Sequence, residues 1–309
     1  MRTTLRIVAP LAMLLATACG SGTDSTPPST LPATTLPATT QASTTAVTTA
    51  PPTTAPPTTA PSTTATPTTV ALPPIDEPGV ALYFVRGETL TVVGRWLGTM
   101  APDELVRALL AGPTDVERAN GITSLIPVGT QLRGVIVEGN AATVDLSAEY
   151  ESMGGSLAVT LAVAQVTYTL TQLPGVDNVW FRIDGEQRDM LTGEGVMVDP
   201  ATRAEFTDGV LPPMLLEQPF DHSPLSNPIV IAGMTNAFEA TVNYQVLAVD
   251  GSLLVEGVTT AMCGSGCWGG FIAGIGLPFG TKGPVTLRVF DYSEADGTTM
   301  LDLVEVQLI

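Results

Sequence analysis

Positive charge is scarce in this sequence. Lys and Arg together number 12 against 30 Asp and Glu, so the formal net charge is −18, and Lys282 and His222 are the single lysine and the single histidine. An acidic surface repels the phosphates of nucleic acids and the anionic head groups of lipids. We therefore expect no nucleic acid among the partners of this protein.

Long apolar runs are missing as well. The apolar stretch near the start, from Ile7 to Leu15, is far shorter than the roughly 20 residues that a helix needs to span a bilayer. Arg2 and Arg6 precede this stretch and small residues follow it, which is typical of a cleavable export signal. We expect residues 1–18 to be that signal.

Cysteine is nearly absent, with 3 in the chain, and the first directly follows the small residues. The segment Ala16-Thr17-Ala18-Cys19 resembles the lipobox of bacterial lipoproteins, although alanine stands where leucine is commoner. In those proteins the thiol accepts a diacylglycerol, and two acyl chains hold a protein stably on a membrane. The resemblance implies that Cys19 is lipidated and that the protein is anchored on the extracytoplasmic side of the cell membrane. A plain secretory signal with an incidental cysteine is the alternative.

Residues 19–74 consist almost wholly of Thr, Pro, Ala and Ser, with Asp24 as the one charged residue. Such a segment has no helical or strand period and cannot bury enough apolar surface to offset the entropy of ordering. We expect a disordered linker. At roughly 3.1 Å per residue its fully extended limit is about 170 Å, which suits a spacer between membrane and cell wall. A passive tail is the alternative.

The other two cysteines, Cys263 and Cys267, lie close together in "AMCGSGCWGG". A disulfide is the default for paired cysteines in an exported protein, and the intervening glycines give a short loop the freedom to close. Free thiols and a metal site are the alternatives, but two thiols are too few ligands for structural zinc. We expect a disulfide, no metal and no other cofactor.

Residues 75–210 show alternating strand and helix patterns. Apolar alternation with turn residues predicts strands, and a proline followed by acidic residues predicts the start of a helix. The order predicts a small α+β domain with the helices on one face of a single sheet. The expected elements are two strands in 79–97, a helix from Pro102 to Gly112, a hairpin over 131–147 with its turn at Gly139-Asn140, a helix from Leu157 to Leu173, and a strand in 175–185.

Residues 211–309 are expected to form a second domain, which shows strand periodicity from residue 228 onward. Val242, Tyr244, Val246 and Ala248 fall on one face of an expected strand, and Asp250-Gly251 follows as a hairpin turn. Short strands with regular turns favour a β-sandwich. The stretch "DGVLPPMLLEQP" before this region is expected to be a linker.

Several ordered motifs of the first region resemble the GerMN domain. They are "AGPTDVE", "SLIPVGTQL" (124–132), "ATVDLSAEY" (142–150) and "QVTYTLTQLPGVDNVWFRIDG" (165–185). That domain occurs in sporulation, spore-germination and other envelope lipoproteins. The resemblance implies an α+β fold akin to the ring-building modules of secretion systems, and it implies no catalytic residues.

The second region resembles the immunoglobulin-like domain of bacterial spore germination proteins. The resemblance rests on "AFEA" (237–240), on "GCWGGFIAGIGLPF" and on the position of the domain after a GerMN-like one. It implies an all-β immunoglobulin-like sandwich, but the short Cys263–Cys267 spacing differs from the long inter-sheet bridge of antibody domains.

Candidates for chemistry are few. His222 lies in the Pro-rich "PFDHSPLSNP" beside Asp221, and a catalytic histidine needs a nucleophile or an acid within hydrogen-bonding distance. Pairs among Asp145, Glu149 and Glu151 have the residue types that glycosidases use. We expect a turn residue and solvated surface acids instead, and no catalytic residue.

Two further features have a functional and a structural interpretation. "DYSEADGTTMLD" (291–302) carries acids suited to calcium, but Asp296 stands where an EF-hand loop needs glycine, so we expect a hairpin turn. Trp96, Trp180 and Trp268 could contact a sugar or a protein, but we expect buried tryptophans.

These features favour a non-enzymatic envelope lipoprotein that acts as a binding or assembly module. The expected partners are envelope proteins, a cell-wall polymer or a second copy of the chain in a homo-oligomer, with the lipid anchor as the membrane contact. The alternatives are a peptidoglycan- or glycan-binding module and a divergent wall hydrolase.

Overall fold

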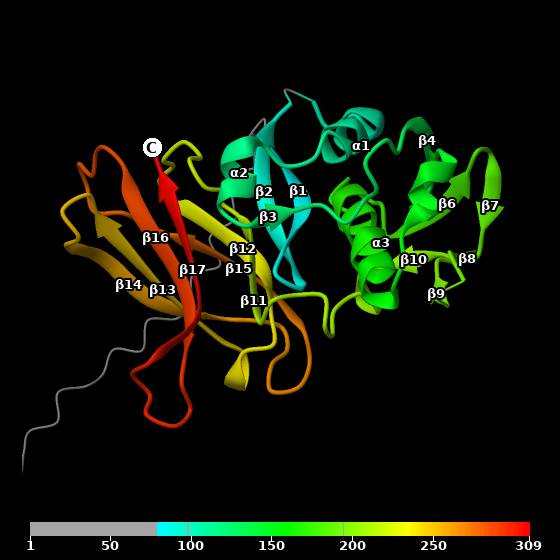
Figure 1. The fold of residues 1–309 in the computed structure, drawn as a ribbon. Coiled ribbons are helices and arrows are strands. Elements are labelled where there is room, and N and C mark those ends of the chain that lie inside the picture. Colours follow the sequence, from blue (N-terminus) through cyan, green and yellow to red (C-terminus); the bar gives the residue numbers. More distant parts are fainter. Residues whose placement is uncertain (1–78, 98, 194) are drawn as a thin grey trace, which may run out of the picture. The chain divides into compact units, whose positions relative to one another are not determined.

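A computed structural model describes residues 79–309, apart from 98 and 194, and these residues all belong to one compact unit (Figure 1). The expected signal peptide, the lipidated Cys19 and the linker at 19–74 lie outside the described residues. The fold prediction, an α+β domain followed by an all-β immunoglobulin-like sandwich, is confirmed for the described part.

The first domain contains two main sheets instead of the single sheet that we predicted. The smaller has the order β2-β1-β3, and the larger has the order β10-β6-β5-β4 with β7 beside β6. Strands β5 and β6 pair in parallel, whereas the other pairs are antiparallel. The strands are β1 (Gly79–Arg86), β2 (Thr89–Trp96), β3 (Ile122–Thr123), β4 (Leu132–Glu138), β5 (Ala141–Leu146), β6 (Asn178–Ile183), β7 (Glu186–Arg188), β10 (Ala201–Thr202) and the small pair β8 (Met190–Leu191) and β9 (Val196–Met197).

The two predicted hairpins of this domain are confirmed. β1 and β2 pair along their full length, and the turn between them contains Gly87 with a φ of 64°. β4 and β5 turn at Gly139, with a φ of 62°. Glycine adopts this left-handed conformation without the steric cost that a Cβ brings, which explains why both turns were visible in the sequence.

Helix α1 (Pro102–Leu110) begins at the predicted proline, with Asp103 and Glu104 in its first turn. The short α2 (Asp115–Ala119) was not predicted. It begins with a capping box in which the Thr114 hydroxyl accepts from the Glu117 amide, while the Glu117 carboxylate accepts from the Thr114 amide. This reciprocal pair satisfies backbone donors that a helix start leaves open.

Helix α3 (Ser156–Leu170) overturns the expectation that the helices cover one face of a sheet. It contacts β1 and β2 of the smaller sheet as well as β6 and β10 of the larger one. Every residue from Leu161 to Leu170 is buried, whereas Leu157, expected on the apolar face, is 45% exposed. A helix that is apolar on all sides is stable only when it is surrounded by protein.

Two of the buried polar residues inside α3, Gln165 and Thr169, bond to β1. Gln165 donates from Nε2 to the carbonyl oxygen of Tyr83 at 3.0 Å, and the Thr169 hydroxyl accepts from the Tyr83 amide at 3.4 Å. Buried polar groups are tolerated where they find such partners. The backbone amide and carbonyl of Tyr83 are therefore both bonded to α3.

The second domain is the predicted β-sandwich. Its sheets have the orders β11-β12-β15 and β14-β13-β16-β17, all antiparallel, and the turn between β13 and β14 contains Gly251 as expected. The strands are β11 (Met214–Gln218), β12 (Ile229–Thr235), β13 (Thr241–Ala248), β14 (Leu253–Thr260), β15 (Gly269–Ile275), β16 (Val285–Tyr292) and β17 (Met300–Leu308). The 3-10 segments of the chain are η1 (Ala148–Ser152), η2 (Arg203–Glu205) and η3 (Phe238–Ala240).

Strand β11 contributes to the hydrophobic cores of both domains, so the expectation that this stretch is only a linker is wrong. Met214 and Leu216 pack into the core of the sandwich, while Leu215 packs into the core of the first domain. Successive side chains of a strand point to opposite faces, so one strand can serve two cores. Phe220, just beyond β11, also belongs to the first core.

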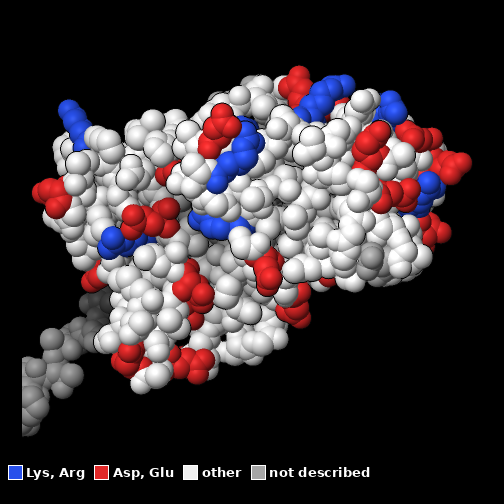
Figure 2. Space-filling model, in the orientation of Figure 1, with Lys and Arg blue, Asp and Glu red and all other residues white. Residues whose placement is uncertain are grey.

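On the face shown in Figure 2, acidic side chains are scattered widely and basic ones stand among them. Of the helices in the described range, none has the length and apolar character that a membrane crossing requires.

Candidate functional site

A partly buried polar cluster joins the first domain to strand β11. Arg203, from η2, lies at its centre and donates from Nη1 to Glu217 Oε1 at 2.6 Å, from Nη2 to the Tyr83 hydroxyl at 3.1 Å and from Nε to Thr171 Oγ1 at 2.7 Å. Tyr83 also donates its hydroxyl to Glu217. We call Arg203, Glu217 and Tyr83 the junction triad.

Aromatic rings enclose the guanidinium of the junction triad. Its carbon lies 4.6 Å from the centre of the Tyr168 ring and 5.5 Å from the centre of the Tyr83 ring. A cation over an aromatic face gains from the ring quadrupole, and more so when it is desolvated. The contacts fix Arg203 between α3, β1 and β11.

Electrostatics keep Tyr83 and Arg203 each in one protonation state around neutral pH. Burial and the neighbouring Glu217 carboxylate raise the pKa of Tyr83 well above its ordinary value. Burial lowers the pKa of Arg203, but the interactions with Tyr83 and Glu217 raise it by a larger amount. The pKa of Arg203 therefore lies above its ordinary value. Tyr83 therefore stays a donor and Arg203 stays charged, which fits a structural link and not proton transfer.

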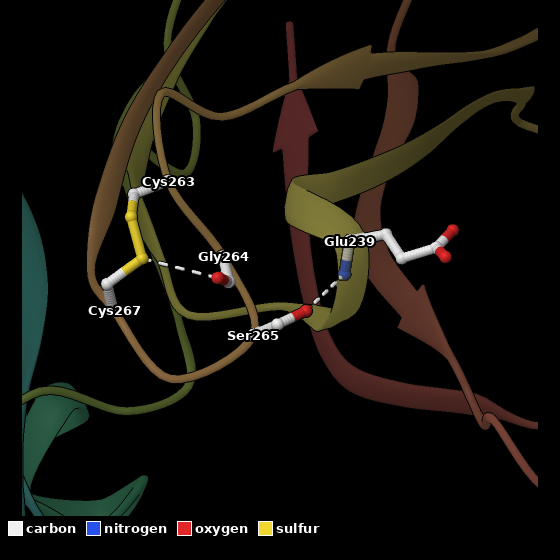
Figure 3. The surroundings of a disulfide bond; sticks show 5 residues. All are labelled: Glu239, Cys263, Gly264, Ser265 and Cys267. Atoms are coloured by element: carbon white, nitrogen blue, oxygen red, sulfur yellow. Dashed lines mark hydrogen bonds between the residues drawn. A yellow bond between two sulfur atoms is a disulfide. The ribbon is translucent and has the colours of Figure 1, made fainter.

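A second feature is the loop that follows β14 (Figure 3). Cys263 and Cys267 form a disulfide with a Cα–Cα distance of 5.8 Å. Ser265 Oγ accepts a hydrogen bond from the Glu239 amide at 2.8 Å, and the Glu239 carboxylate points away from the disulfide. Thus the loop rests on the backbone of η3.

Gly264 makes this contact close. A Cβ at this position would lie 2.3 Å from the amide nitrogen of Ala240 and 2.4 Å from the carbonyl oxygen of Ala237. Both are backbone atoms, which move less readily than the end of a side chain. The loop needs glycine here in order to reach η3, and the disulfide restrains its two ends.

Reducing the disulfide is expected to lower the free energy of unfolding by about 2 kcal/mol, because a closed short loop removes entropy from the unfolded chain. The measurement compares urea unfolding with and without dithiothreitol. A chain with Cys263→Ser and Cys267→Ser should start at the lower stability and should not respond to the reductant. Equal stability of the oxidised and reduced wild-type protein would contradict this expectation.

His222 lies in a turn, as expected. Its φ is 62°, and its amide donates to the carbonyl oxygen of Gln307 at 2.6 Å. Its Nδ1 lies 2.9 Å from the carboxylate of Asp221, and the imidazole is 65% exposed. These contacts hold the chain before β12 along the end of β17.

The acids proposed for glycosidase chemistry each have a structural partner. Asp145 accepts from the Gly185 amide at 3.0 Å, and Glu151 pairs with Arg188 at 3.1 Å. A hydrogen bond from Ser147 lowers the pKa of Glu149, which is the opposite of what a general acid needs. Within the described part of the chain no group of three or more His, Cys, Asp or Glu side chains could hold a metal ion.

The middle of the stretch 291–302 forms the turn between β16 and β17, as expected, while its ends belong to the two strands. Asp296 accepts from the amides of Thr298 and Thr299, both at 2.9 Å, and from the Thr299 hydroxyl at 2.6 Å. These bonds, with the Thr299 hydroxyl first among them, lower the pKa of Asp296 to about 2. Its oxygens are occupied by the turn itself.

Asp296 should therefore titrate near pH 2, below its ordinary value of 3.8. A folded pKa below the unfolded one means that the carboxylate stabilises the fold above about pH 3.8, and that this contribution is lost as the pH falls toward 2. Carbon-detected NMR titration of the side-chain carboxyl checks this. A midpoint near 3.8 would show that the turn bonds do not form in solution.

The tryptophans differ in exposure. Trp96 is 49% exposed at the end of β2, so the expectation that it is buried is wrong. Trp180 and Trp268 are half-buried, and Trp268 donates from Nε1 to Asp208 at 2.7 Å. Of the three tryptophans, Trp96 therefore has the most exposed side chain for contact with a ligand.

Comparison with known families assigns both domains. The family model described as sporulation and spore germination matches residues 81–189, and the model described as the immunoglobulin-like domain of bacterial spore germination matches residues 215–298. The chain carries a GerMN domain followed by an immunoglobulin-like domain. The resemblance found in the sequence is thereby confirmed.

Solved structures similar to this chain have been found at low identity. The first GerMN domain of the sporulation protein GerM from Bacillus subtilis is 23% identical, with a TM-score of 0.35 over 40% of this chain and 97% of that one. The tandem GerMN domains of the same protein are 18% identical, with a TM-score of 0.36 over 64% of this chain and 61% of that one. A putative lipoprotein from Clostridium perfringens is 20% identical, with a TM-score of 0.29 over 40% and 87%. No curated protein matches the chain.

Both domains of the chain therefore belong to germination-related families, which are not families of known enzymes. The junction triad connects Tyr83 and Arg203 of the first domain to Glu217 of the second. Sequence reasoning missed all three residues, since they are 14 to 134 positions apart and form no local motif.

Proposed function

We propose that the protein is a membrane-anchored extracytoplasmic lipoprotein that serves as a non-catalytic binding and assembly module of the cell envelope. The observation that carries the proposal is the succession of two germination-type domains that share strand β11. Such a pair offers a composite surface to a partner. Asp145 and Glu151 have the residue type that hydrolases use, but each bonds within the fold: Asp145 to the Gly185 amide and Glu151 to Arg188.

The sequence before residue 79 supports the location. Cys19 follows an export-type signal, and the Thr- and Pro-rich stretch after it is long enough to hold the folded domains away from the bilayer. The partner is then an envelope protein or a second copy of the chain. Nucleic acid is disfavoured by the charge of −18.

The anchor is tested by fractionation of cells that produce the wild type or Cys19→Ser. The wild type should stay with the membrane and incorporate labelled fatty acid, and the variant should do neither. Membrane retention of an unlabelled wild-type protein would remove the lipid anchor from the proposal.

The non-catalytic role is tested by incubating the purified protein with cell-wall peptidoglycan. We expect no release of soluble fragments. Release that is lost when one acidic side chain is replaced would establish a hydrolase and overturn the proposal.

One observation favours a second candidate, a glycan-binding module. Trp96 is 49% exposed, and an exposed indole face can stack on a sugar ring. In a pull-down with purified wall, Trp96→Ala should then reduce retention, whereas replacing the half-buried Trp180 tests for a general loss of structure. Failure of the wild type to be retained would eliminate this candidate.

A further inference from the structure

A groove of about 890 Å³ lies against strand edges from both domains. Residues of β2 and of β17 line it, together with Met214 and Leu216 of β11. Both β2 and β17 stand at the end of their sheet order. The groove therefore faces two strand edges that no described strand covers, and such edges are templates for pairing with another chain.

The edge of β2 is partly used. The Leu90 amide donates to the carbonyl oxygen of Val210 at 2.8 Å, so the backbone of Leu90 points away from β1. Backbone groups alternate in direction along a strand, so Val92 points the same way. At Gly94 the carbonyl oxygen is taken by the Arg95 guanidinium at 3.0 Å. Little of this edge remains for a long partner strand.

The edge of β17 is open over a short stretch, between the shift in its register with β16 that follows Leu301 and the contacts at Gln307. At its end the Gln307 carbonyl oxygen accepts from the His222 amide, and the Gln307 amide donates to Asp221 Oδ1 at 2.8 Å. By the same alternation the backbone of Glu305 points outward, next to these contacts and inside the groove. The Asp221 carboxylate marks where pairing within the chain stops and an open edge begins.

The lining of the groove is acidic. Arg86 is its one basic side chain apart from His222, against the carboxylates of Glu117, Asp221, Asp302 and Glu305. Arg95 neutralises Glu117 at 2.6 Å, and Arg288 neutralises Glu305 at 2.7 Å.

Asp302 is different from these paired acids. It forms no ion pair within residues 79–309. Partial burial and the nearby Asp291 carboxylate raise its pKa. The Asp302 carboxylate therefore has no cationic partner among the described residues.

We propose that this groove binds an extended, basic segment of a partner protein, which adds as a strand to the open edge of β17 and places Lys or Arg side chains near Asp302 and Asp221. Main-chain bonds to the edge give affinity in this mode, and alternate side chains give specificity. A second copy of the chain is a poor occupant, because it carries a charge of −18 and a single lysine. The proposal names the partner chemistry of the binding role proposed above and rests on that role.

The test uses fluorescein-labelled peptides of about eight residues, a usual strand length, titrated into the purified protein at low salt. An alternating Lys-Val peptide should bind saturably. The matched Glu-Val peptide should bind at least about tenfold more weakly, a difference of roughly 1.4 kcal/mol. A Lys-Val peptide with alternate backbone nitrogens methylated should lose binding to a similar extent, because it keeps its charge but cannot pair with the edge.

Two variants of the protein locate the site. Asp302→Asn keeps a residue that tolerates the observed φ of 51° and should weaken Lys-Val binding about threefold, as expected for an exposed ion pair. Glu256→Gln, on β14 at the opposite end of the same sheet, removes an equal charge and should have no effect.

Equal binding of the methylated peptide, equal effects of the two variants, or no binding of the Lys-Val peptide would each overturn the groove proposal. None of these results would contradict the proposal that the protein is an anchored binding module. That proposal is tested separately, by fractionation of cells and by capture of partners in cells.

Discussion

Replacing Arg203 by alanine is expected to lower the free energy of unfolding by about 1.5–3 kcal/mol, the range for hydrogen bonds to charged groups, because it removes one partner of a partly buried ion pair. The side chains of Arg203 and Glu217 are only 25% and 20% exposed. The same change removes the hydrogen bond that Arg203 donates to the Tyr83 hydroxyl. It also removes the cation–π contacts of Arg203 with the rings of Tyr83 and Tyr168. Urea unfolding followed by circular dichroism measures the loss.

A matched control is Arg107→Ala. Arg107 pairs with Asp103 on the surface of α1, where the side chains are 62% and 46% exposed, and such a pair contributes about 0.3–0.5 kcal/mol. Arg203→Met combined with Glu217→Gln should recover part of the loss, since no buried charge then lacks its partner. Equal effects of Arg203→Ala and Arg107→Ala would show that the junction triad is not a buried link.

Replacing Phe220 by alanine is expected to cost about 3–5 kcal/mol, the range for a phenylalanine removed from a packed core. Phe220 is 7% exposed although it lies beyond β11, and it covers the backbone of β2 at Gly94. A Cβ on Gly94 would lie 2.5 Å from the Phe220 Cβ, so no larger residue fits beneath the ring.

The control for this prediction is Phe279→Ala, because Phe279 is fully exposed and its removal should change stability by no more than about 0.5 kcal/mol. Gly94→Val should destabilise the wild type but should cost less when Phe220 is already alanine, since the overlaps with the Phe220 ring atoms at 2.6 and 2.8 Å then disappear and only the one with the Cβ remains. Strictly additive effects of Gly94→Val and Phe220→Ala would contradict the contact.

The parts of the fold that are specified locally were predicted from the sequence. The β1–β2 and β4–β5 hairpins and the start of α1 follow from turn glycines, alternation and Pro102. The strands of the sandwich follow from period-2 alternation, because each strand has one buried face.

The parts that depend on long-range contacts were not predicted. Helix α3 was placed on one face of a sheet, but its sequence is apolar all round and two sheets enclose it. The stretch around β11 contains three prolines at 212, 213 and 219 and looked like a linker, although its alternating side chains serve two cores. Nothing local in the sequence indicates which distant surface a strand will cover.

The candidate site shows the same division. The short Cys263–Cys267 spacing and the turn character of His222 were visible locally. The junction triad depends on Tyr83 and Glu217, which are 134 positions apart, and a single sequence carries no signal of that contact. Trp96 was expected to be buried, but it ends an edge strand and lies half open to solvent.

The central claim is that the anchored protein binds an envelope partner, and in-cell crosslinking followed by mass spectrometry tests it most directly. A photo-reactive residue would replace exposed positions of both domains in turn, such as Ile136 on β4 and Leu303 on β17, with membranes purified before digestion. The account predicts repeated capture of one envelope protein, or of a second copy of the chain, from at least one of these positions. Capture of cell-wall fragments alone, or of nothing from every position, would contradict it.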